Sequence, residues 1–154
     1  MTKPSDFIYT TYIKSTPEKV WAAITNSEFT RQYWGHNIIS DWKKGSEWKL
    51  VTLDEKMVKA VGEVLESLPP QRLVLSWAKP DNKTDGSRAV FEIEAVADMV
   101  CLRVVHGDFK AGSDLAGKVS QGWPLVLSGL KSFLETGKPL DISWAANSCG
   151  GKAA

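Results

Sequence analysis

The period of the hydrophobic positions changes along the chain, and the first part combines one strand with one helix. Phe7–Lys14 is rich in aromatic and β-branched residues, which predicts a strand. Ser15–Glu18 then supplies the start signals of a helix, with a hydroxyl side chain, a proline and an acidic residue in succession. Val20, Trp21 and Ile24 are spaced to form one apolar face of this helix.

A second, shorter helix is predicted to begin at Ser27 as its N-cap and to end at Gly35. Beyond it the apolar positions alternate with a period of two, which is typical of half-buried strands. Short polar turns between these segments favour antiparallel hairpins. A glycine at position 62 indicates a bulge. The predicted strands cover 38–42, 46–53, 57–68, 73–77, 88–96 and 99–106, with a polar loop at 79–87.

The last predicted element is an amphipathic helix that begins between Leu115 and Trp123 and ends at Gly137. Pro124 leaves two alternatives open for its start. Either the helix begins at Trp123 with the proline in its first turn, or it begins earlier and kinks at the proline.

This order of elements predicts an α+β fold with a curved antiparallel sheet of about seven strands. An antiparallel sheet with one apolar face must cover that face, and only the last helix is long enough to do so. A single helix is too narrow to fill the concavity of so wide a sheet. We therefore expect an internal cavity that is lined by apolar side chains.

Composition narrows the classes of function. The chain has 154 residues with 43% hydrophobic residues and a net charge of +1, which is typical of one globular domain. The charge balance gives no indication of nucleic-acid or membrane binding. No signal peptide or membrane-spanning run is visible, which predicts a cytoplasmic protein. Two cysteines give no disulfide framework. We expect one domain at 1–142 and a flexible tail at 143–154.

Several motifs together resemble a known family. The runs are STPEKVWAAIT, FTRQYWG, KKGSEWKL, VGEVLESLPPQRLVLSW, VVHGDF and GWPLVLSGLKSFLE, and they cover roughly 7–137. They look like the family related to the activator of the Hsp90 ATPase, within the START-like, birch-pollen-allergen-like (SRPBCC) superfamily. The resemblance implies a helix-grip fold. It also implies a cavity that binds lipids, sterols, polyketides or hormones in some members, or a chaperone partner in the name-giving member.

The candidate site is the set of side chains that alternation and helix phase direct toward the interior. A set of aromatic residues facing a space that one helix must cover favours a ligand-binding wall over a filled core. Two histidines would give the polar contacts, although backbone-bonded histidines are the simpler interpretation. The candidates are Trp34, His36, Trp48, Trp77, Phe91, His106, Trp123, Leu127 and Leu130.

The sequence offers little support for catalysis or a cofactor. No cluster of ligands has metal-site spacing, and no nucleophile-base pair or nucleotide-binding loop is recognisable. Glu63 is the one strand carboxylate whose direction alternation leaves open. We expect a protein, monomeric or homodimeric, that binds a small hydrophobic molecule without cofactor or metal. The alternatives are a co-chaperone module and a hydrolase, cyclase or dehydratase that works in the cavity.

Overall fold

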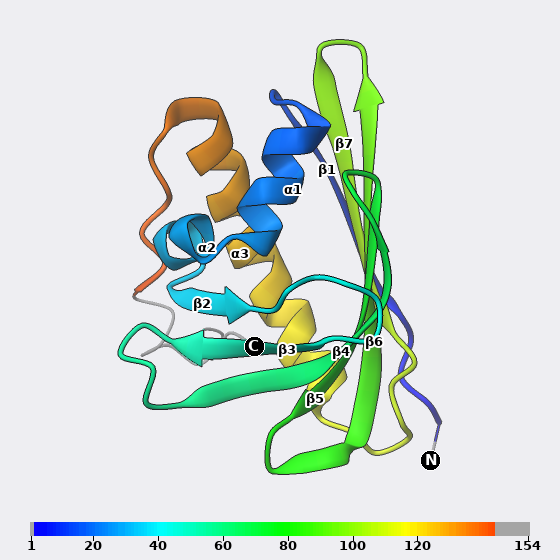
Figure 1. Ribbon diagram of the computed structural model, residues 1–154. Coiled ribbons are helices and arrows are strands. Elements are labelled where there is room, and N and C mark those ends of the chain that lie inside the picture. The colour runs from blue at the N-terminus through cyan, green and yellow to red at the C-terminus, as the bar shows by residue number, and fades with distance from the viewer. Residues whose placement is uncertain (1, 144–154) are drawn as a thin grey trace.

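A computed structural model describes residues 2–143, which form one seven-stranded antiparallel sheet and three helices (Figure 1). The strand order across the sheet is β1-β7-β6-β5-β4-β3-β2, so the first strand is brought to the edge beside the last one. The strands are β1 Phe7–Ile13, β2 His36–Ile39, β3 Glu47–Thr52, β4 Val58–Leu68, β5 Arg72–Lys79, β6 Asn82–Val96 and β7 Met99–Gly107.

The two short helices are α1 Pro17–Thr25 and α2 Ser27–Tyr33. Thr16 caps α1 by accepting a hydrogen bond from the Lys19 backbone N–H. Asn26 caps α2 in the same way, so the prediction that Ser27 is the cap was wrong. The Ser27 hydroxyl instead donates to the Ile38 carbonyl over 2.7 Å, which ties the helix to β2.

The long helix α3 covers Leu115–Thr136, so it begins at the early end of the predicted range. Pro124 lies inside the helix, and the alternative in which it occupies the first turn was wrong. Gly137 ends the helix in the left-handed conformation with φ 80°, as its position predicts.

Two predictions about the strands need correction. Residues 79–87 are not a loop, because β5 and β6 are joined by a tight turn at Pro80-Asp81 and β6 begins at Asn82. Polar residues can occupy a strand whose outer face meets water, which is why this run looked like a loop. The register of β4 is irregular between Val64 and Glu66, and again opposite Leu50 and Val51 of β3, which pair with Ala60 and Val58, but not at Gly62.

All three helices lie on the same side of the curled sheet (Figure 1). The inward positions of β7 are fully buried, so the predicted alternation is confirmed there, whereas it ends on β6 after Ile93, because Glu94 and Ala95 are both exposed. The result is a helix-grip fold in which α3 covers the concave face of the sheet. No helix of residues 2–143 is long and apolar enough to cross a membrane. Apart from Ser143, the predicted tail lies outside the described residues, as do Trp144 and Cys149.

Candidate functional site

The aromatic candidates meet in the interior, where they pack against one another. Trp77 of β5 is central, with its ring centroid 4.6 Å from Trp48 and 5.5 Å from Trp123. The ring centroid of Trp123 also lies 5.5 Å from that of Trp34 and 5.6 Å from that of Phe91. None of the five rings is more than 4% exposed. They fill much of the space between the sheet and α3 that the sequence predicted to be hollow.

His106 lies in this cluster, completely buried, with both ring nitrogens bonded to side chains. The Trp123 indole N–H donates to its Nδ1 over 3.0 Å. The proton of the neutral ring is therefore on Nε2, which lies 2.8 Å from the Ser87 hydroxyl, and that hydroxyl donates to the Trp77 carbonyl. Burial lowers the pKa of His106 to about 3, so the ring is neutral near pH 7.

His36 occupies a different place, at the start of β2. It is half-buried, and its Nδ1 lies 3.0 Å from the Trp34 carbonyl, so this nitrogen carries the proton and donates it. Burial lowers the pKa of His36, and the positive charge of Lys59 lowers it further. Nε2 of the neutral ring is therefore left as a hydrogen-bond acceptor.

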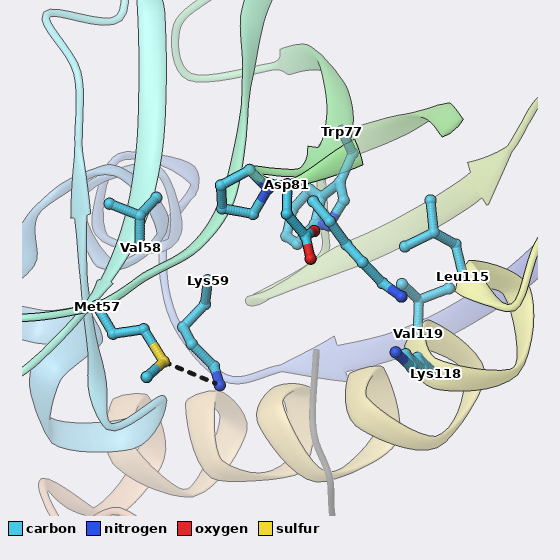
Figure 2. A pocket seen from close by; sticks show the side chains of 10 residues that line it. Met57, Val58, Lys59, Trp77, Asp81, Leu115, Lys118 and Val119 are labelled. Carbon is cyan, nitrogen blue, oxygen red and sulfur yellow. Dashed lines mark hydrogen bonds between the residues drawn. The ribbon is translucent and has the colours of Figure 1, made fainter. Parts of the chain in front are cut away.

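An open cleft lies beside the aromatic cluster, where the starts of β4 and α3 approach the end of β5 (Figure 2). Its volume is about 380 Å³, within the range of small-molecule sites. Trp77 is shared between the cleft and the aromatic cluster. The side chains that line the cleft are Met57, Val58, Lys59, Trp77, Lys79, Pro80, Asp81, Leu115, Lys118 and Val119.

The rim of the cleft carries three lysines. Lys79 and Lys118 share one carboxylate, that of Asp114, at 3.0 Å and 3.3 Å. The hydrogen bonds from Lys79 and then Lys118 hold the pKa of Asp114 below its usual range. Lys59 has no carboxylate within 4 Å among residues 2–143, and its Nζ lies 3.9 Å from the sulfur of Met57 (Figure 2).

Only Trp77 among the nine predicted site residues lines this cleft. Leu127 and Leu130 are buried on α3 and belong to the same hydrophobic core as the aromatic rings. Sequence reasoning missed Val58, Leu115 and Val119. The signal for the last two was their spacing of one helical turn, which could be recognised only if α3 was known to begin as early as Leu115.

The open question about Glu63 is answered by its exposure, so this carboxylate is not an inward acid. Cys101 lies on the outer-facing side of β7, away from His106, as alternation predicts. Within the described part of the chain, no group of three or more histidine, cysteine or acidic side chains is placed to hold a metal ion.

Comparisons with known structures agree with this fold. An Aha1 dimer from Colwellia psychrerythraea superposes with a TM-score of 0.73 at 23% identity, covering 88% of this chain and 99% of that one. CalU16 from Micromonospora echinospora gives 0.70 at 21% identity, covering 86% and 77%. An Hsp90 activator from Plasmodium falciparum gives 0.60 at 25% identity, covering 71% and 77%. A search of curated proteins found no match.

Helix-grip architecture, with a long helix across a curled antiparallel sheet, defines the class as START-like. Within that class the family model described as "Activator of Hsp90 ATPase homolog 1-like protein" matches residues 14–135. The chain belongs to this family, and the resemblance noted in its sequence is confirmed.

Proposed function

We propose that this protein binds a small, largely apolar molecule in the cleft between β4, β5 and the first turns of α3. The observation that carries the proposal is the open cleft of about 380 Å³ whose buried lining side chains are Trp77, Leu115 and Val119. A cleft of this size with apolar walls and a few polar side chains is the usual form of a small-molecule site. The helix-grip fold supports the same proposal, because it places a long helix over a curved sheet that the helix does not fill.

The aromatic cluster behind Trp77 remains a candidate extension of the site. His106 and the rings of Trp34 and Trp123 are buried and in mutual contact, so a ligand would reach them only after these side chains separate. The described conformation therefore favours binding in the cleft. A role of the deeper residues in binding stays a prediction.

Two measurements test the proposal. Native mass spectrometry before and after denaturation should reveal a retained molecule of small mass. Titration with the neutral fluorescent probe N-phenyl-1-naphthylamine should give saturable binding, weakened in a Val58→Asn variant that puts an amide in the cleft wall. Ile8→Asn is the matched control, because Ile8 is 54% exposed on the outer side of β1 and is absent from the cleft lining. No retained mass and no saturable binding would overturn the proposal.

Chaperone binding is a second candidate, supported by the family membership and by the Plasmodium Hsp90 activator among the similar structures. The test is the ATPase rate of Hsp90 from the same organism, with and without this protein. Unchanged hydrolysis at saturating protein, together with no complex in analytical ultracentrifugation, would exclude it. The same sedimentation run on the protein alone distinguishes a monomer from a homodimer.

A further inference from the structure

The charges on the rim of the cleft are unequal. Three lysine side chains, Lys59, Lys79 and Lys118, lie in its lining, and two aspartates oppose them, Asp81 in the lining and Asp114 beside it. Asp114 is already shared by two of the lysines, so one carboxylate faces two ammonium groups. Lys59 reaches in from β4 on one side and Lys118 from α3 on the other (Figure 2).

The apolar and the cationic parts of the cleft are separate. Trp77, Leu115 and Val119 are buried and form its apolar depth, whereas Lys59 and Lys118 are exposed at its mouth. A molecule that fits both parts has an apolar body and a negatively charged end. A neutral apolar molecule would fit only the first part.

Resting on the proposed function, we infer that the ligand is a small amphipathic anion, with its apolar body against Trp77 and its carboxylate or similar anionic group between Lys59 and Lys118. Lys59 is the lysine best able to bind it, because it is not committed to Asp114. Asp81 opposes the same anion, since its carboxylate lies in the same lining.

His36 gives an internal reporter of the ligand's charge. Burial lowers the pKa of His36 most and the positive charge of Lys59 lowers it further, so a change of charge at Lys59 should move this pKa. An anion bound at Lys59 would offset that charge and raise the pKa of His36. A neutral ligand in the same cleft would leave this interaction unchanged.

The test compares decanoate with 1-decanol, which have the same alkyl chain and differ in the charge of the head. At low salt, decanoate should bind more tightly than 1-decanol. Added salt should weaken the binding of decanoate and leave the binding of 1-decanol unaffected. Lys59→Gln should weaken decanoate by about two- to fivefold, the range of exposed ion pairs, and Lys59→Arg should preserve binding. Asp81→Asn should strengthen it. Lys44→Gln, in the turn before β3 and outside the cleft lining, is the control.

The outcomes separate the two proposals. If neither probe binds, the proposal that the cleft binds apolar molecules is wrong. If both bind equally, with no effect of Lys59→Gln or salt, the cleft stands and the anionic ligand is overturned. An NMR titration adds a readout that a loss of folding cannot imitate. The pKa of His36 should rise with decanoate and not with decanol, and an unchanged pKa with bound decanoate would place the anion elsewhere.

Discussion

Trp123 and His106 join the long helix to the sheet by a buried hydrogen bond of 3.0 Å, from the indole N–H to Nδ1. The same imidazole reaches Ser87 on the neighbouring strand, and the Ser87 hydroxyl reaches the Trp77 carbonyl. Three buried polar side chains are thereby satisfied in one chain of hydrogen bonds. This arrangement explains a fully buried histidine without assigning it a catalytic role.

The Trp123 hydrogen bond can be measured by comparing two tryptophans. Trp123→Phe removes the donor and leaves a buried acceptor without a partner, which costs about 1–3 kcal/mol beyond the lost packing. Trp34→Phe is the matched control, because its buried Nε1 has no hydrogen-bond partner among residues 2–143. Urea unfolding should therefore show a larger loss for Trp123→Phe. Equal losses would mean that the hydrogen bond adds nothing to stability.

The low pKa of His106 predicts a loss of stability in mild acid. The unfolded state binds a proton on this ring below about pH 6.5, whereas the folded state does not until about pH 3. The contribution of the neutral His106 ring to the free energy of unfolding is therefore complete above pH 6.5. It decreases as the pH falls toward 3, by up to about 1.4 kcal/mol per pH unit. His36 acts in the same direction, because its pKa is also lowered.

Unfolding free energies between pH 5 and 6.5 test this prediction, because the carboxylates titrate mainly below that window. In a His106→Gln variant the unfolding free energy should depend less steeply on pH than in the native protein. A His36→Gln variant isolates the contribution of His36. A slope that survives in the double variant would assign the pH dependence to other groups.

Position 62 requires a glycine because the Trp48 indole N–H and the Ser76 carbonyl oxygen lie directly against its backbone. The indole N–H donates to that carbonyl over 2.8 Å. A Cβ at this position would collide with that carbonyl oxygen and would lie 2.5 Å from the Trp48 Nε1 atom. Gly62→Ala should therefore destabilise the protein by about 1–3 kcal/mol, as overpacking does. Gly86→Ala is the control, since nothing lies within 4 Å of its added methyl group. A thermal melt in which both variants behave alike would contradict this account.

Trp77→Ala should cost about 3–5 kcal/mol of stability, as truncations of large buried aromatics do. Trp77 touches Trp34, Trp48 and Trp123, so the truncation leaves a cavity in the centre of the cluster. Trp21→Ala, at a half-buried position on α1, should cost less. Chemical denaturation measures both, and a smaller loss for Trp77 would indicate a loosely packed interior. Trp77→Phe is the better variant for binding studies, because it keeps an apolar ring beside the cleft.

Sequence patterns predicted the helices and strands better than they predicted the packing of the interior. Alternation placed Val100, Leu102 and Val104 on the buried face of β7, and Gly137 marked the end of α3, because both signals are local. The beginning of β6 could not be predicted, since its polar residues become a strand only through pairing with β5. Ser87 lies opposite Trp77 in that ladder and is buried, a fact that depends on register rather than composition.

The candidate site was predictable only in part, for a physical reason. Alternation and helix phase predicted that Trp34, Trp77 and Trp123 point inward, but they cannot show whether such rings pack together or leave a space. The cleft depends on three segments that meet near Trp77, and its lysines are unremarkable in the sequence. Their gathering at one mouth is a property of the tertiary structure alone.

The position of β1 at the edge beside β7 has a consequence for how the chain folds. Phe7 is paired with His106, and Ile13 with Val100, so the first strand closes the sheet with residues made much later. Contacts between such distant parts of a chain are slow to form, because the intervening loop must be closed first. During synthesis, the apolar face of β1 therefore remains uncovered until β7 and α3 have been made. The native sheet can therefore be completed only after Gly107, the last residue of β7, has been made, and until then the unpaired β1 is a segment open to aggregation.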